Sequence, residues 1–173
     1  MYYSVWNIGF ITSKTYFYNF ENKPSSEAIV DCIDDYFSDK LYMKLMILLD
    51  NGPDNSGVRT AFLKFLVNLS DKYQNEIELV YYLPYHSKYN PVERIWARLE
   101  KMWNGMLLTS WKICHRVMEY LTWKKERSKV KYITKEYKKG VTYSKEEMAQ
   151  YEGVNIHRNE ALKKWSILIT SLI

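Results

Sequence analysis

Cysteine is nearly absent from this sequence, which has only Cys32 and Cys114 among its 173 residues. The two lie far apart and have no partners at the spacing of a zinc site. Neither a disulfide framework nor a zinc knuckle is therefore predicted. We expect both residues to be buried thiols in a reducing cytoplasm.

Long apolar runs are also missing. The longest, such as residues 45–49, are far shorter than the roughly 18 residues that a membrane span needs. Residues 1–10 lack the basic segment and the cleavage site of a signal peptide. No membrane partner is expected, and the expected location is the cytoplasm.

Acidic residues are scarce in the second part of the chain. Residues 1–80 hold 7 Lys and Arg against 11 Asp and Glu, whereas the remaining residues hold 18 against 9. An excess of cations attracts polyanions, and neutralising backbone phosphates is the usual source of sequence-independent DNA affinity. Solubility is the alternative explanation of the same charge.

The order of apolar and turn-forming segments predicts an α/β fold. Residues 1–20 alternate aromatic and β-branched side chains around a polar break, which predicts a β-hairpin. After a helix that opens at Pro24, the uninterrupted apolar run at 45–49 is typical of a strand covered on both faces. A helix over 62–69 and a strand over 77–83 complete a right-handed crossover with parallel strands.

The remaining elements are predicted mainly from their ends. Asn90 and Pro91 favour a helix start, and the apolar face continues to about Trp103. A further helix is expected over 110–123, followed by a basic run at 124–139. The tail is expected to hold a short helix near Ser144 and a terminal apolar segment.

Two carboxylates fall where a crossover fold places its functional crevice. Asp50 follows the apolar strand, and Glu93 lies in the first turn of the helix after the next strand. Because the crevice lies beyond the carboxyl ends of parallel strands, we expect the two side chains to converge. Mg²⁺ prefers oxygen ligands, and paired ions about 4 Å apart suit in-line attack on a phosphodiester.

Each of these features also has a purely structural explanation. Asp50 is a residue type common at the start of a turn, and Glu93 has the position of a capping-box residue that bonds back to Asn90. Tyr132 and Tyr137 are interleaved with lysines. This pattern predicts either stacking on DNA bases or a solvated charged face.

Two longer segments resemble a known family. They are LMILLDNGPDNSGVRTAFLKFL and IELVYYLPYHSKYNPVERIWARLEKMWNG. Both are similar to the catalytic core of DDE transposases of bacterial insertion sequences, of the Rhodopirellula type, with a looser likeness to mariner-like elements. The resemblance covers roughly residues 3–108, and residues 163–169 also look related.

The resemblance implies an RNase H-like fold, in which helices flank a mixed sheet, and two Mg²⁺ or Mn²⁺ ions that support DNA strand cleavage and transfer at transposon ends. Asp50 matches the second acid of the family and Glu93 the third. The family's first acid lies on a strand ahead of a hairpin like residues 3–20, so we expect the first strand to be missing and the chain to be truncated and inactive alone. The acids at 31, 34 and 35 fall on a predicted helix and do not replace it.

Residues 1–123 are thus predicted to be a partial RNase H-like catalytic core, and residues 124–173 a basic C-terminal extension. The expected partners are transposon-end DNA and either a second copy of the chain or an upstream-encoded N-terminal segment. A non-catalytic DNA-binding or regulatory remnant and a nuclease of the same fold are the alternatives. The candidate DNA-binding residues are Arg59, His86, Ser87, Lys88, Lys129, Lys131 and Lys135.

Overall fold

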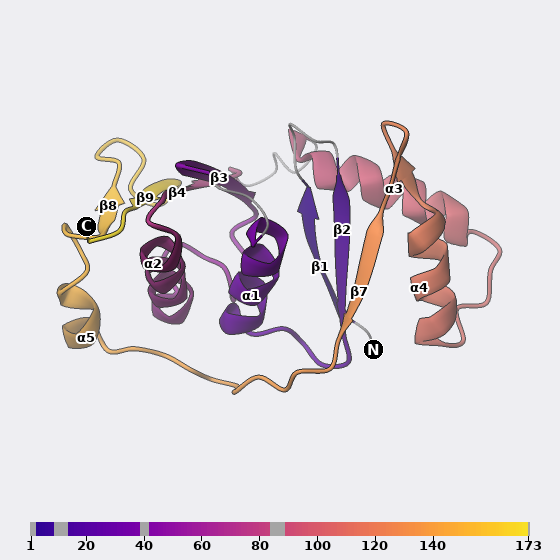
Figure 1. Ribbon diagram of the computed structural model, residues 1–173, viewed down its shortest axis with the longest axis horizontal. Helices are drawn as coiled ribbons and strands as arrows, with labels where there is room; N and C mark the ends of the chain where they lie inside the picture. Colours follow the sequence, from indigo (N-terminus) through magenta and orange to yellow (C-terminus); the bar gives the residue numbers. More distant parts are fainter. Residues whose placement is uncertain (1–2, 9–13, 39–41, 84–88, 173) are drawn as a thin grey trace. The chain divides into compact units, whose positions relative to one another are not determined.

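The computed structural model describes residues 3–8, 14–38, 42–83 and 89–172 (Figure 1). It has the mixed α/β composition that the sequence predicts. The chain divides into two compact units. We call residues 1–24 and 88–136 the hairpin unit, and residues 25–87 and 137–173 the crossover unit. Among the described residues, no helix has the length and apolar character that crossing a membrane requires.

The hairpin unit is built on a three-stranded mixed sheet. β1 (Tyr3–Ile8) pairs antiparallel with β2 (Thr15–Phe20), which confirms the predicted hairpin. β2 in turn pairs in parallel with β7 (Lys129–Ile133), a pairing that the sequence did not predict. A small antiparallel hairpin of β5 (Thr122–Trp123) and β6 (Glu126–Arg127) precedes β7.

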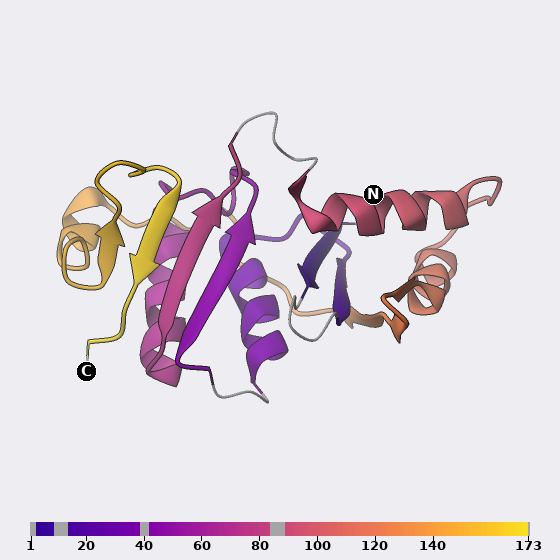
Figure 2. The same ribbon diagram turned by 90° about the horizontal axis from the view of Figure 1, so that it is seen from above.

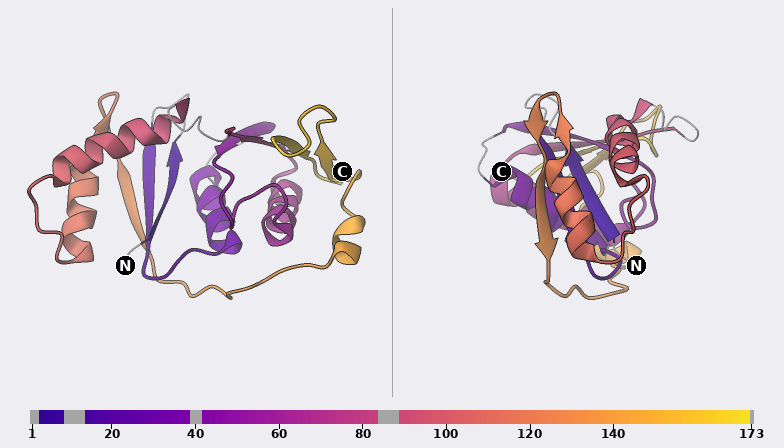
Figure 3. Two further views of the ribbon diagram at one scale, coloured as in Figure 1. Left: turned by 180° about the vertical axis from the view of Figure 1, so that it is seen from behind. Right: turned by 90° about the vertical axis from the view of Figure 1, so that its right-hand side faces the viewer.

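Two helices cover one face of this sheet (Figure 3). They are α3 (Pro91–Trp103) and α4 (Trp111–Tyr120). Phe17 of β2 is fully buried against Ile95 of α3 and Val117 of α4. Burial of such side chains stabilises a unit by roughly 2 kcal/mol each, so this cluster fixes how the helices lie on their own sheet.

The crossover unit contains the predicted strand, helix and strand. β3 (Lys44–Leu49) and β4 (Glu76–Tyr81) are parallel, and α2 (Thr60–Tyr73) connects them. β9 (Ser166–Ile169) lies antiparallel beside β4, and β8 (Ile156–Arg158) lies beyond β9. α1 (Ser26–Phe37) and the short α5 (Lys145–Ala149) complete the unit.

Among the described residues of the crossover unit, helices cover β3 on one face only, so the prediction of burial on both faces is wrong. α1 and α2 lie on the same side of the four-stranded sheet (Figures 1 and 2). Leu45 is 8% exposed, whereas its neighbour Met46 is 57% exposed. The outer face also carries an ion pair of 3.0 Å between Lys44 and Glu78. An apolar run in the sequence does not reveal which face of a strand has no helix to cover it.

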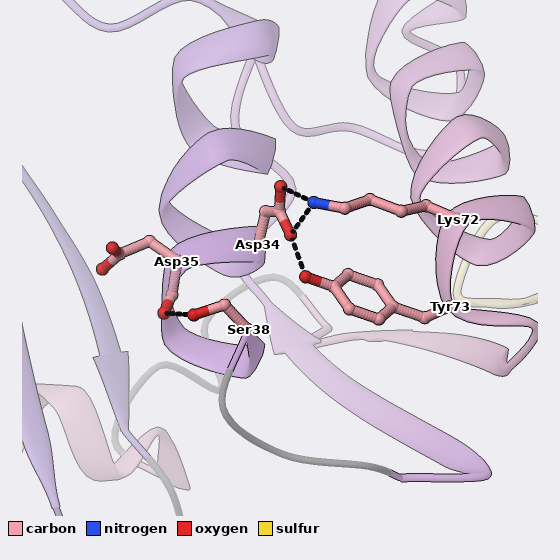
Figure 4. Close-up of polar contacts among 5 residues, drawn as sticks. All are labelled: Asp34, Asp35, Ser38, Lys72 and Tyr73. Carbon is pink, nitrogen blue, oxygen red and sulfur yellow. Dashed lines mark hydrogen bonds and ion pairs between the residues drawn. The ribbon is translucent and has the colours of Figure 1, made fainter.

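A polar cluster ties α1 to α2 (Figure 4). The Asp34 carboxylate accepts hydrogen bonds from Lys72 Nζ, at 2.7 and 2.9 Å, and from the Tyr73 hydroxyl at 2.5 Å. These bonds to Asp34 are the main cause that raises the pKa of both partners. Asp31 likewise accepts a bond from the Tyr137 hydroxyl at 3.1 Å. Both helix acids therefore have partners within the crossover unit.

Candidate metal centre

Asp50 follows the last residue of β3, where a turn-rich loop begins. Its side chain is exposed, and its Oδ1 accepts a hydrogen bond of 2.9 Å from Asn55 Nδ2. Within the described part of the chain, the carboxylate has no other hydrogen bond. One oxygen of Asp50 is therefore held in a fixed direction while the other stays available to a ligand.

Gly52 allows the Asn55 amide to lie close to Asp50. A Cβ atom at position 52 would lie 2.9 Å from Asn55 Oδ1, which is too close for any residue but glycine without a shift. Asn55 Oδ1 is itself buried and accepts no hydrogen bond from the residues that the structure describes. The amide therefore acts through its nitrogen, which faces the Asp50 carboxylate.

Buried side chains hold the backbone of the loop that follows Asp50. The Tyr81 hydroxyl donates to Asn55 O at 2.8 Å, and Ser26 Oγ donates to Asp54 O at 2.7 Å. Burial raises the pKa of Tyr81 well above its ordinary value, and the nearby charge of Asp50 adds to the rise. The hydroxyl consequently stays protonated and keeps its role as a donor.

Arg158 adds a third anchor that sequence reasoning missed. Its Nη1 donates to Gly57 O at 2.8 Å. Its guanidinium also forms a bidentate ion pair with the Glu152 carboxylate, with bonds of 2.8 and 3.2 Å. Arg158 and Gly57 are 101 positions apart. No local pattern in the sequence predicts a contact between residues so far apart in the chain.

Glu93 lies in the first turn of α3 with an exposed side chain. Asn90 caps this helix, as predicted, because its side chain accepts a bond of 3.1 Å from the Val92 N–H. The hydrogen bonds described for α3 include none from the Asn90 N–H to the Glu93 carboxylate. A complete capping box is present instead at the start of α5, between Ser144 and Glu147. The capping-box explanation of Glu93 is thus not supported.

Asp50 belongs to the crossover unit and Glu93 to the hairpin unit. The convergence of their carboxylates therefore stays a prediction. Among the residues with described positions, no three His, Cys, Asp or Glu side chains are grouped to hold one ion. Asp50 by itself fits a hard cation, because it offers an exposed and oriented carboxylate oxygen.

The candidate DNA-binding residues fall into three groups. Arg59 is half-buried, and its Nη2 donates to Val141 O at 3.2 Å, so this side chain links two segments of the crossover unit. A second group lies outside the described residues and consists of His86, Ser87 and Lys88. The third group has exposed side chains in the hairpin unit and consists of Lys129, Lys131 and Lys135.

The two tyrosines predicted to stack on DNA bases have partners within the protein. The Tyr132 ring stacks on Trp111 with centroids 4.7 Å apart, and its hydroxyl donates to Glu21 at 2.6 Å. The Tyr137 hydroxyl donates to Asp31, as described above. Both residues are only partly exposed. The structure therefore favours a packing role for both rings.

A family model described as the Rhodopirellula transposase DDE domain matches residues 12–171. The chain belongs to this family. No curated protein and no solved structure gives a significant match. DDE transposases act on DNA and generally use divalent metal ions, so the acids at the end of β3 and the start of α3 lie in a domain suited to that chemistry.

The DDE match continues through the C-terminal part of the chain. Residues beyond 123 contribute β7 to the sheet of the hairpin unit, and β8 and β9 to the sheet of the crossover unit. The domain boundary proposed after residue 123 stays a prediction. The same residues form strands in both main sheets of this DDE domain.

Replacing Asn55 with alanine is expected to weaken metal binding by the DDE domain roughly tenfold to a hundredfold, because partners that orient a ligand commonly have effects of that size. Stability should change little, since the substitution also removes the buried, unpaired Oδ1. Titration with Mn²⁺, with thermal unfolding in parallel, measures both effects. Asn68→Ala, on the exposed side of α2, is the control. Equal Mn²⁺ affinity in the two variants would contradict the orienting role.

Proposed function

We propose that this DDE domain binds Mg²⁺ or Mn²⁺ through Asp50 and Glu93 and uses the ions to cleave and transfer DNA strands at transposon ends. The observation that carries the proposal is the Asp50 carboxylate. It is exposed at the carboxyl end of a parallel strand, one oxygen is oriented by Asn55, and the chain belongs to the transposase DDE family.

The residues around Asp50 have a definable part in this chemistry. The Asn55 amide holds one carboxylate oxygen, and Tyr81 and Arg158 hold the backbone of the loop that carries Asn55. Asp50 and Glu93 would hold the divalent ion, which would supply activation of the attacking water or hydroxyl and neutralisation of charge on the phosphodiester. The protein's contribution on this side is to keep the Asp50 carboxylate in one orientation.

Two carboxylates are fewer than two-metal chemistry uses, and the described residues hold no group of three possible ligands. At least one further carboxylate is therefore needed beside Asp50 and Glu93. We expect the isolated chain to bind divalent ions more readily than it cuts DNA. Its cleavage should be slow, because Asp50 and Glu93 alone would leave one metal position short of a ligand.

Nicking of supercoiled plasmid in Mn²⁺ tests the proposal. We expect slow nicking that disappears in EDTA and in either Asp50→Asn or Glu93→Gln. With labelled transposon ends, products joined to target DNA would distinguish a transposase from a nuclease of the same fold. Nicking that persists in both variants would overturn the assignment. Metal-independent DNA binding without any nicking, together with unchanged Mn²⁺ affinity in the variants, would favour the non-catalytic alternative.

A further inference from the structure

The positive charge of the protein is concentrated in one stretch of the hairpin unit. Residues 111–131 hold seven Lys and Arg against two Glu, and the rest of the chain holds 18 of each. The formal net charge of +5 therefore comes entirely from this stretch. It comprises α4, the β5–β6 hairpin and the start of β7.

One exposed face of α4 carries part of this charge. Lys112, Arg116 and Tyr120 follow one another at intervals of four residues, and all three side chains are exposed. Residues with this spacing lie above one another on a helix, about 6 Å apart along the axis. The acid nearby on the helix is Glu119, and its Oε1 lies 3.6 Å from His115 Nδ1, a contact that is an ion pair only when the imidazole is protonated. α4 thus presents two cations and an aromatic ring in a row.

The β5–β6 hairpin follows directly on the end of α4 (Figure 3). The Arg127 guanidinium lies 5.7 Å from the ring centroid of Tyr120, which is itself 61% exposed. This contact joins the hairpin to the row on α4. The side chains of Lys124 and Lys125 are exposed at the tip of the hairpin.

The hairpin tip has lysines where its backbone favours other residues. Trp123 pairs with Glu126, so Lys124 and Lys125 form a two-residue turn, and their φ angles are 47° and 73°. Positive φ at both positions favours Asn-Gly or Asp-Gly, because a Cβ atom is disfavoured there. The turn therefore has lysines at two positions where the backbone conformation favours Asn-Gly or Asp-Gly. Such an outlier points to a role for the side chains themselves.

We propose that this basic face, consisting of Lys112, Arg116, Lys124, Lys125 and Arg127 with Tyr120, binds the sugar-phosphate backbone of double-stranded DNA. Cations about 6 Å apart on a helix can contact neighbouring phosphates of one strand, because the strand winds around the duplex and its phosphates lie farther apart than their rise of about 3.4 Å along the axis. Backbone contacts of this kind position a protein on DNA without reading its sequence. The face shares no residue with the proposed metal site, and DNA binding at it needs no metal ion.

Fluorescence anisotropy with a labelled 30-base-pair duplex, in buffer with EDTA, tests this proposal. The variant Lys124→Gln/Lys125→Gln/Arg127→Gln is compared with Lys138→Gln/Lys139→Gln/Lys145→Gln, which removes the same charge from exposed sites in the crossover unit. We expect the hairpin variant to bind about tenfold more weakly or worse, with a slope of log K against log salt smaller by two to three units. The control should change the slope much less.

Two further measurements make the outcome decisive. Thermal unfolding of both variants shows whether the hairpin variant is folded, and Lys112→Gln/Arg116→Gln on α4 tests the same face without touching the turn. Equal losses in the hairpin variant and the control, or no loss in either variant of the basic face, would overturn the proposal. Because EDTA removes metal ions, a failure of Asp50 and Glu93 as metal ligands would leave these results unchanged.

Discussion

Asp50→Asn is expected to lower the Mn²⁺ affinity of the DDE domain at least about a hundredfold. Loss of a residue that merely orients a ligand weakens binding 10- to 100-fold, and loss of the charged ligand itself should have at least that effect. The substitution keeps the shape of the side chain, and its effect on folding should be small because Asp50 is exposed. Calorimetric titration with Mn²⁺ measures the change.

Asp54→Asn is the matched control for this experiment, because it removes the same charge from the same loop. Asp54 anchors the loop through its backbone oxygen, which accepts from Ser26, and the substitution leaves that atom in place. A general electrostatic effect would weaken binding equally in both variants. Equal losses would therefore show that Asp50 acts as one negative charge among others and is not a ligand.

Gly57→Ala is expected to destabilise the protein by about 1 to 2 kcal/mol. A Cβ atom at position 57 would lie 2.7 Å from Ile167 Cδ1 and 3.2 Å from Tyr81 Cε2, and both side chains are buried. Overpacking of a core typically costs about 1–3 kcal/mol. The alanine stiffens the unfolded chain and recovers only about 0.4–1 kcal/mol. Overpacking therefore outweighs the entropic gain, and chemical denaturation measures the difference.

The rescue variant Gly57→Ala/Ile167→Val identifies the cause of this loss. Valine lacks the Cδ1 atom that the new Cβ would meet, so the two changes should be less destabilising together than the sum of their separate effects. Purely additive effects in the double-mutant cycle would show that the loss arises elsewhere, for example from the Arg158 bond to Gly57 O.

Local signals were enough to predict most of the secondary structure and the position of both acids. The Asn90-Pro91 pair fixed the start of α3, and the turn-forming residues after Leu49 fixed the end of β3. These signals work because capping and turn chemistry depend on a few neighbouring residues. Asn55 lies in the same loop as Asp50. Its closeness to Asp50 in the sequence was the one local signal that could have identified it as the residue that orients the carboxylate.

Contacts between distant segments could not be predicted from these local signals. The basic run at 124–139 contains β7, which pairs with β2 more than a hundred residues earlier. Arg158 reaches Gly57 over a similar distance. Strand partners and anchors of this kind depend on tertiary packing, which a single sequence does not encode in any local pattern. The exposure of Met46 escaped prediction for the same reason.

Iron-directed cleavage of the protein tests most directly whether Asp50 and Glu93 bind the same ion. Fe²⁺ also binds oxygen ligands, and with ascorbate and peroxide it produces radicals that cut the polypeptide beside the bound metal. We predict two cuts, one near residue 50 and one near residue 93, and both should disappear in Asp50→Asn as well as in Glu93→Gln. Mass spectrometry of the fragments locates the cuts. A cut near residue 50 that persists in Glu93→Gln would contradict a shared metal site.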